Sequence, residues 1–354
     1  MEWIDEGFAR HWNGLSEHLT AGLRPMVLSF FSGVPPDDAG TIADLVCDGK
    51  KLRGCLVLAM CDALGGPLEG AMTAAVGVEC VQAASLIHDD LVDDDAVRRD
   101  RPATWIVKGG RRAVLLGDLI FATALHRSAE AGREQVLVLA KAIARVATGA
   151  YREPLDAVET HALLQQQPRR GGVYEHLIQT KTGALFAAAA ELGAVAAAAP
   201  PALCAAAADF GARLGEAYQM ADDLADLVSL PEGAAPSPQQ AAALEVLVAY
   251  LTEAAPELAR PARIGAVPAS TARASADTVV DSGPDNPGDL AALLQREIQR
   301  RLSLARQALG AFPEGPRLAF LRGLPDALVR PVAAGERCAL PRDPSPYPHR
   351  DPAP

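Results

Sequence analysis

Aromatic side chains are scarce in this 354-residue chain. Phe, Tyr and Trp together make up 5% of it, whereas hydrophobic residues as a whole make up 49%. The shortage argues against a β-sandwich, and the abundance of small and aliphatic residues suits packed helices better. The hydrophobic share is large enough for a sizeable core, and the length is within reach of one large helical domain.

Closely spaced cysteine pairs and an excess of basic charge are also absent. The six cysteines form no Cys-x-x-Cys motif, and most lie in apolar stretches, so we expect reduced, buried thiols and a cytoplasmic protein. Lys and Arg number 33 against 44 Asp and Glu, which gives a net charge of −11. This balance provides no broad basic surface and therefore argues against a nucleic-acid partner.

Long uninterrupted hydrophobic runs are missing as well. The most hydrophobic tract, residues 184–208, is mostly alanine and is interrupted by Glu191 and by a Pro-Pro pair. Such a tract favours packed helices over a membrane span. The acidic start, Met1–Glu6, is unlike a signal peptide. We therefore expect no transmembrane segment.

Helical spacing of apolar residues dominates the chain up to about residue 230. The clearest predicted helices span residues 50–64, 71–92, 111–130, 135–152, 173–195, 201–229, 289–310 and 316–329. Residues 231–290 are rich in Pro, Ala, Ser, Thr and Gly, so we expect a partly flexible insertion there. Residues 331–354 are Pro-rich and are expected to form a disordered tail. The prediction is a single all-α domain over residues 1–330.

Two aspartate clusters of the same form are the most informative motifs. They are Asp89-Asp90-Leu91-Val92-Asp93 and Asp222-Asp223-Leu224-Ala225-Asp226. Each places its first and last carboxylate one helical turn apart on the same face. Burying so much like charge is costly unless cations neutralise it. Two such clusters facing each other predict a site for hard divalent metal ions and, through them, for a diphosphate.

Each cluster could also be ordinary surface charge without a binding function. The first could be a solvated acidic helix end, although its carboxylates directly follow an apolar helix instead of lying on a polar face. The second, taken alone, could equally be a surface helix. The pairing of the two motifs is what favours a metal site.

Basic residues accompany the clusters. Arg98 and Arg99 follow the first cluster and have the forked donors that suit phosphate oxygens. Lys50 and Arg53 are spaced to share one face near a predicted helix N-terminus, a place that favours anions. Lys181, between two threonines in an apolar helix, can reach a buried anion. Ordinary solubilising charge at Lys50 and Arg53, and snorkelling of Lys181 to the surface, are the alternatives.

Together these motifs resemble the trans-polyprenyl diphosphate synthases, the family that makes geranylgeranyl diphosphate and its relatives. The resemblance runs from about Gly49 to Asp226 and includes the Lys-Thr-Gly sequence that begins at Lys181. It implies an all-α isoprenoid synthase helical bundle with a central active-site cavity, and a homodimer. It also implies an enzyme, a prenyltransferase that uses Mg²⁺, with Mn²⁺ able to substitute, to condense isopentenyl diphosphate head to tail with an allylic diphosphate.

The resemblance further implies a role for each of a set of polar residues. The metal ligands would be Asp89, Asp93 and Asp222, supported by Asp90, Asp223 and Asp226. The allylic diphosphate would be held by Arg98 and Lys181, and isopentenyl diphosphate by Lys50, Arg53, Gln82 and Arg99. The developing carbocation would face the oxygen dipoles of Thr182 and Gln219. No side-chain base is implied, since the released diphosphate is thought to take the proton.

The sequence departs from the family pattern in three places. Relatives usually have a lysine-rich segment soon after the second cluster, but Leu227–Ala243 contains no Lys or Arg. The common Gly-Gln pair is Gly149-Ala150 here, and many relatives have His where Gln82 stands. Each lost charge-assisted contact would weaken diphosphate binding by about 1.5–3 kcal/mol. Any loss of activity is therefore expected to originate at the second cluster.

Small residues precede the first cluster and bear on product length. Ala84 and Ser85 lie one turn before Asp89, so no bulky side chain stops a growing tail there. Val81 lies one turn deeper, and Phe121 on a facing helix would close the pocket further down. Because each five-carbon unit adds about one helical turn, ~5.4 Å, a C20 product is favoured over C15.

Two other functions stay open. A class I terpene cyclase on the same fold would keep the aspartates, but it would have no use for a second diphosphate site. A catalytically weakened partner subunit of a prenyl diphosphate synthase would be expected to lose aspartates, and this chain keeps all of those in both motifs. The departure after Asp226 fits either alternative.

Overall fold

The computed structural model describes residues 6–154, 156–229, 238–254 and 287–334, and most of them are helical. The helices are α1 (Glu6–Phe30), α2 (Pro36–Cys47), α3 (Leu52–Ala63), α4 (Leu68–Val92), α5 (Thr104–Lys108), α6 (Gly110–Ala131), α7 (Arg133–Arg152), α8 (Ala157–Gln166), α9 (Gly171–Ile178), α10 (Ala184–Ala196), α11 (Pro201–Ser229), α12 (Pro238–Ala254), α13 (Pro287–Ala308) and α14 (Pro316–Ala333). A π-helix, Gln179–Gly183, joins α9 to α10, and a short 3-10 helix, Leu309–Ala311, follows α13. Within the described residues the only strands are β1 (Val97–Arg98) and β2 (Arg101–Pro102), an antiparallel pair just after α4.

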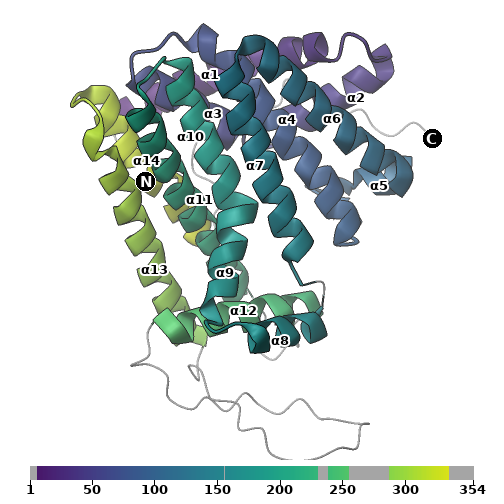
Figure 1. Cartoon of the computed structure of the whole chain (residues 1–354), viewed down its shortest axis with the longest axis vertical. Coiled ribbons are helices and arrows are strands. Elements are labelled where there is room, and N and C mark those ends of the chain that lie inside the picture. The colour runs from purple at the N-terminus through teal and green to yellow at the C-terminus, as the bar shows by residue number, and fades with distance from the viewer. Residues whose placement is uncertain (1–5, 155, 230–237, 255–286, 335–354) are drawn as a thin grey trace, which may run out of the picture.

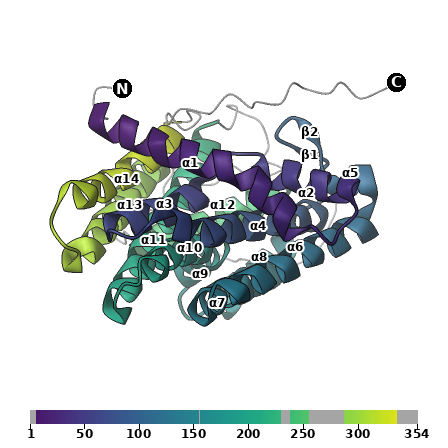
Figure 2. The same ribbon diagram turned by 90° about the horizontal axis from the view of Figure 1, so that it is seen from above.

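The helices form a bundle around α4, α10 and α11 (Figure 1). Helix α3 packs on α4 and α10, α6 packs on α4, and α7 packs on α10. On the opposite side α13 and α14 pack on α11. Helix α1 lies over α3 and α4 (Figure 2). Helices α8 and α12 lie side by side across the lower end of the bundle in Figure 1.

The inner helices are apolar on almost every side, as is usual for helices in the middle of a bundle. In α10 every residue from Ala184 to Ala194 is buried except Glu191. Small residues let these helices approach closely. A Cβ on Gly211 of α11 would lie 2.3 Å from the carbonyl oxygen of Phe186. This close packing of alanine and glycine explains how a large core forms with so few aromatic residues.

All the helices predicted from periodicity are present, with ends shifted by a few residues. Helices α1, α2, α5, α8 and α12 were not among the predicted helices. Residues 238–254, which lie within the stretch predicted to be a partly flexible insertion (231–290), form the helix α12. Its Ala-rich and Leu-rich sequence favours a helix, but Pro-rich neighbours hid the pattern. The rest of that stretch, apart from the start of α13, and most of the predicted tail lie outside the described residues.

One described helix, α4, is long and apolar enough to cross a membrane by length and composition. In the fold, 67% of its most apolar 18-residue segment is buried, and the last turn of the helix contains Asp89 and Asp90. A core helix of a bundle has these same properties.

Candidate active site

The first aspartate cluster lies at the C-terminal end of α4. The helix ends at Val92, and the N–H of Asp93 donates to the carbonyl oxygen of Asp89 at 2.8 Å. Asp90 is buried and accepts a hydrogen bond from Nε of Arg98 at 2.6 Å. Arg98 is therefore brought beside the cluster by the β1–β2 turn, as the sequence predicts. Its guanidinium is engaged by a carboxylate of the chain itself.

Lys181 reaches the first cluster from the π-helix. Its Nζ lies 3.8 Å from Oδ1 of Asp89 and 2.5 Å from Oε2 of Glu153, and its side chain is 27% exposed. Burial lowers the pKa of Lys181, but the nearby carboxylates of Glu153 and Asp89 outweigh this effect and raise it. The ammonium group is thus charged and directed inward instead of snorkelling. π-Helices often occur at functional sites, because the extra residue changes which side chains face inward.

The second cluster lies near the C-terminal end of α11. Asp222 and Asp226 are exposed one turn apart, as predicted. Asp223 accepts hydrogen bonds on both carboxylate oxygens, from the hydroxyl of Tyr174 and, at 3.0 Å, from Nε2 of Gln219. Oε1 of Gln219 accepts from the hydroxyl of Thr182 at 2.6 Å. The two residues predicted to face a carbocation therefore contact each other.

A path of contacts connects the two clusters. It runs from Asp89 to Lys181, and from the adjacent Thr182 through Gln219 to Asp223. The π-helix therefore stands between two motifs that are far apart in the sequence. Within the described residues, no three His, Cys, Asp or Glu side chains are grouped closely enough to hold a metal ion. A metal ion at either cluster would need further ligands, such as diphosphate oxygens.

Both clusters contain carboxylates with raised pKa values. Burial raises the pKa of Asp93 to about 6, and repulsion from Asp89 adds to the effect. Burial also raises the pKa of Asp223 to about 6, in spite of the hydrogen bonds that favour its ionised form. Desolvation and the neighbouring Asp226 raise the pKa of Asp222. The protein thus disfavours negative charge at these positions, and a bound cation would relieve the cost.

The prediction that Lys50 and Arg53 share a helix face was wrong. Helix α3 begins only at Leu52, after Lys51 in the left-handed conformation with φ of 50°. Lys50 lies before the helix and is exposed, with Nζ 3.4 Å from the hydroxyl of Tyr218. Only Arg53 lies in the first turn of α3.

Basic residues from two parts of the chain nevertheless gather near the start of α3. The guanidinium carbon of Arg53 lies 4.6 Å from the ring centre of Phe186, and burial lowers the pKa of Arg53. Arg99 packs over Gly49, where a Cβ would lie 2.5 Å from Nη2, and it pairs with Asp48 at 3.3 Å. Glycine is required at this approach because its φ is +91°. The structure thus brings together Lys50, Arg53 and Arg99, as the resemblance implies.

The remaining predicted residues line the α4 face. Gln82 and Ser85 are half-buried, and the hydroxyl of Ser85 donates to the carbonyl oxygen of Gln82 at 2.9 Å. Ala84 is buried. Phe121 of α6 packs edge-on against His88, with ring centres 5.7 Å apart. Phe121 therefore lies on a helix that faces α4, as predicted. It does not lie deeper than Val81, where it was expected to close the pocket, because its ring packs against the residue that directly precedes Asp89.

The comparison with protein families agrees with this geometry. The sequence model of the family described as polyprenyl synthetase matches residues 40–235. These residues include both aspartate clusters and the π-helix. The chain belongs to the polyprenyl synthetase family. Among solved structures, the chain superposes on the polyprenyl synthase from Caulobacter crescentus, which is complexed with calcium and isoprenyl diphosphate. The TM-score is 0.65 at 25% identity, over 94% of this chain and 98% of that chain.

Curated relatives match a smaller part of the chain. It is 33% identical over 195 residues to a short chain isoprenyl diphosphate synthase of Methanothermobacter thermautotrophicus, covering 52% of this chain and 56% of the relative. It is 33% identical over 219 residues to heptaprenyl diphosphate synthase component 2 of Geobacillus stearothermophilus, covering 62% of this chain and 66% of the relative. The matches thus span about half to two thirds of these relatives' lengths.

Three residues around the site were not predicted from the sequence. Glu153 at the end of α7 pairs with Lys181, and Tyr174 of α9 binds Asp223. The third, Arg301 of α13, binds the buried Glu216 behind the second cluster. Tyr174 stands about two helical turns before Lys181, a spacing that could have suggested it. Nothing local in the sequence links Arg301 to the site.

Proposed function

We propose that the chain catalyses the Mg²⁺-dependent head-to-tail condensation of isopentenyl diphosphate with an allylic diphosphate, giving a trans-polyprenyl diphosphate. The path of contacts from Asp89 through Lys181 and Thr182 to Asp223 supports this most strongly. It connects the two carboxylate clusters through two adjacent residues of the π-helix. A diphosphate bound there would be held by Mg²⁺ at the aspartates and by the ammonium group of Lys181.

The residues present fit a hard divalent cation. Both clusters offer only oxygen ligands, and desolvation disfavours their charge when no cation is bound. Asp89, Asp93 and Asp222 would hold the ions, while Asp90 and Asp223 are fixed by protein groups. Mg²⁺ supplies charge neutralisation of the departing diphosphate. The calcium and isoprenyl diphosphate in the Caulobacter crescentus protein support this assignment.

The other polar residues would bind and orient the two substrates. Lys181 and Arg98 would bind the allylic diphosphate beside the first cluster. Isopentenyl diphosphate would lie at the basic group formed by Lys50, Arg53 and Arg99, with Gln82 on the adjoining face of α4. The oxygen dipoles of Thr182 and Gln219 would stabilise the developing carbocation, in a site that must exclude water. The released diphosphate would take the final proton.

A C20 product, geranylgeranyl diphosphate, fits the residues before the first cluster. Ala84 and Ser85 are small, and the Phe121 ring packs against the α4 face one turn further toward Asp89. A tail that passes the two small residues meets no bulky side chain of α4 in that turn.

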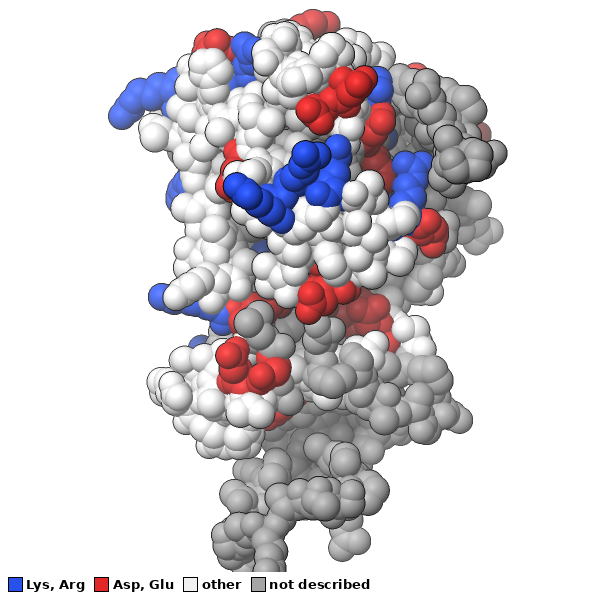
Figure 3. Space-filling model, turned by 90° about the vertical axis from the view of Figure 1, so that its right-hand side faces the viewer, with Lys and Arg blue, Asp and Glu red and all other residues white. Residues whose placement is uncertain are grey.

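We further propose that the chain forms a homodimer through α5 and α6. Large apolar side chains are exposed there, namely Ile106, Val107, Val114, Leu115 and Leu119. Figure 3 looks onto the side of the molecule on which α5 lies in Figure 1, and it shows uncharged surface there, with basic side chains near the middle and acidic side chains above and below them. Exposed large apolar side chains on neighbouring helices are typical of a protein–protein interface.

One experiment separates the candidate activities. Purified protein and Mg²⁺ are incubated with dimethylallyl, geranyl or farnesyl diphosphate, with and without isopentenyl diphosphate, and the products are analysed by mass spectrometry. Elongated diphosphates, chiefly C20, are the expected result. Hydrocarbons formed without isopentenyl diphosphate would indicate a terpene cyclase instead, and a complete lack of turnover would contradict an independent enzyme.

A weakened partner subunit is the second candidate, and one observation favours it. One relative at 33% identity is named as component 2 of a heptaprenyl diphosphate synthase. If this chain likewise works with a second component, its activity should rise when that component is present. The incubation above, repeated with and without a co-purified partner chain, distinguishes the two possibilities.

A further inference from the structure

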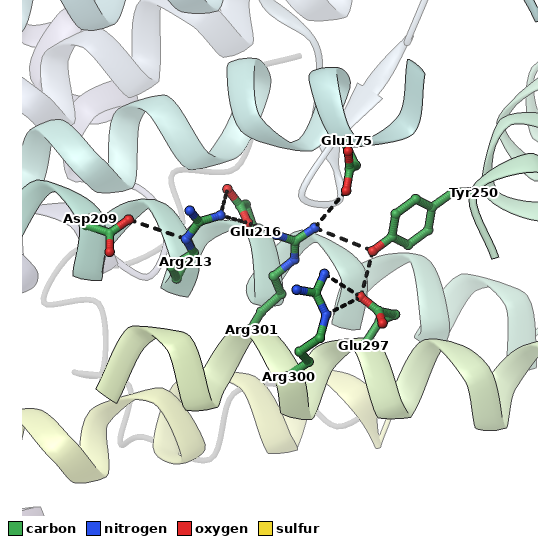
Figure 4. A network of polar contacts seen from close by, with 8 residues as sticks. All are labelled: Glu175, Asp209, Arg213, Glu216, Tyr250, Glu297, Arg300 and Arg301. Carbon is green, nitrogen blue, oxygen red and sulfur yellow. Dashed lines mark hydrogen bonds and ion pairs between the residues drawn. The ribbon is translucent and has the colours of Figure 1, made fainter. Parts of the chain in front are cut away.

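A buried ion-pair network lies behind the second cluster, and the proposed function gives it no role (Figure 4). At its centre is Glu216 of α11, about two turns before Asp223 and 2% exposed. Its carboxylate lies 3.0 Å from Arg301 of α13 and 3.2 Å from Arg213. Arg301 is itself only 3% exposed and also pairs with Glu175 of α9 at 3.5 Å. Because breaking a buried ion pair is costly, this network holds α13 and α9 firmly against α11.

Tyr250 connects α12 to this network. Its hydroxyl donates to Oε2 of Glu297 at 2.7 Å and accepts from Nη2 of Arg301 at 3.4 Å. Its backbone is held as well, because α12 packs so closely on α9 that a Cβ on Gly171 would lie 3.0 Å from the Cα of Tyr250. Tyr250 is 3% exposed. Both ends of this residue are therefore fixed.

Tyr174 of α9 continues the connection to the second cluster. Its ring centre lies 5.0 Å from that of Tyr250, and its hydroxyl donates to Oδ2 of Asp223. The other oxygen of Asp223 accepts from the amide of Gln219, whose own oxygen accepts from Thr182. Tyr174 thus fixes the carboxylate of Asp223, and this carboxylate determines which way the Gln219 amide points.

We propose that Tyr174 and Tyr250 are positioning residues for the second aspartate cluster. Helices α12 and α13 hold Tyr250, Tyr250 holds the ring of Tyr174, and Tyr174 holds Asp223 beside the metal ligand Asp222. The inference rests on the proposed function, which assigns this cluster to Mg²⁺ and a diphosphate. It explains how the cluster is kept in place although the segment after Asp226 has no Lys or Arg.

The variant Tyr174→Phe tests the connection because it removes the hydroxyl and keeps the ring. A lost hydrogen bond to a charged group corresponds to about a 10–100-fold effect. We expect kcat to fall and the Mg²⁺ concentration for half-maximal rate to rise, each by about tenfold or more. The KM for isopentenyl diphosphate should stay within about twofold of wild type, because its basic group lies at α3.

The second variant, Tyr250→Phe, tests whether α12 acts through Tyr174. It should change the same two quantities in the same direction but by less. The double variant should lose no more than Tyr174→Phe alone, because residues that act in series are not additive. Tyr151→Phe is the matched control, since Tyr151 is 91% exposed on α7 and should behave as wild type. Thermal unfolding of each variant shows whether it is folded, and if Tyr174→Phe is not, Tyr250→Phe carries the test.

Calorimetry of inorganic diphosphate binding in the presence of Mg²⁺ gives a readout that does not depend on turnover. If the wild type transfers no prenyl group but binds Mg²⁺ and diphosphate, the proposed function fails and the inference is decided by affinity alone. About tenfold weaker binding by Tyr174→Phe would then support it. Equal affinity would overturn it, as would a wild type that binds neither. With an active wild type, multiplicative losses in the double variant or a matching rise in the KM for isopentenyl diphosphate would also overturn it.

Discussion

The middle aspartate of each motif is held by the protein. Asp90 accepts from Arg98, and Asp223 accepts from Tyr174 and Gln219. In the second motif the outer aspartates are exposed. The two kinds of position therefore differ in what they can do. An aspartate whose oxygens are occupied orients its neighbours, and an exposed one can bind an ion.

The raised pKa of Asp223 predicts a pH-dependent stability. Its folded pKa of about 6 exceeds the ordinary value of about 3.9, so the folded state binds this proton more tightly than the unfolded state. The stabilisation is complete below the ordinary pKa and is lost as pH rises to about 6. Relative to Asp223→Asn, the wild type should lose roughly 2–3 kcal/mol of unfolding free energy between pH 4 and pH 7. Urea unfolding of both proteins across that range measures the difference, and a constant difference would contradict the prediction.

Ser85 gives a second prediction at the residue scale. It is half-buried one turn before Asp89, and its hydroxyl bonds only locally, to Gln82. Ser85→Phe should place a ring in the path of the growing tail and shift the product from C20 toward C15. Ser85→Ala is the matched control and should leave the product length unchanged. Mass spectrometry of the products measures the chain length. An unchanged product length for Ser85→Phe would contradict the hypothesis that the growing tail passes Ser85.

At the scale of elements, the π-helix depends on a close contact with α7. A Cβ on Gly149 would lie 2.3 Å from the hydroxyl oxygen of Thr180, and Thr180 directly precedes Lys181. Gly149→Ala should push the π-helix away, lower kcat/KM about tenfold or more and destabilise the fold by about 1–3 kcal/mol. Gly14→Ala in α1, where a Cβ meets nothing within 4 Å, is the control and should be neutral or slightly stabilising. If the two variants behave alike in both assays, the contact has no such role.

The sequence predicted most elements because inner and outer helices alike repeat apolar residues at α-helical spacing. It could not predict the π-helix, since one extra residue in a turn leaves the apolar character of 173–195 unchanged. It misplaced Lys50, because the left-handed residue Lys51 delays the start of α3. The aspartate clusters were recognisable because their spacing is local. Contacts such as that of Arg301 with Glu216 join distant segments, and only the fold brings them together.

At the scale of the whole molecule, the two long sides of the bundle differ. On the α13 side, buried ion pairs attach the outer helices to α11. On the α5 and α6 side, large apolar residues remain exposed, among them Val107 and Leu115. On the first side, the outer helices of the chain cover α11. On the second side, the exposed apolar residues form a surface that another chain could cover. This asymmetry is the physical reason for placing a dimer interface on α6.

Leu115→Asp tests that interface. Leu115 is 59% exposed on α6, so a charge there is tolerated in an isolated chain but is desolvated when a second copy covers it. We expect the wild type to sediment as a dimer and Leu115→Asp as a folded monomer with an unchanged circular dichroism spectrum. Val158→Asp, a 77% exposed position on α8, is the matched control and should remain dimeric. Analytical ultracentrifugation measures all three, and a dimeric Leu115→Asp would show that the chains associate through a different surface.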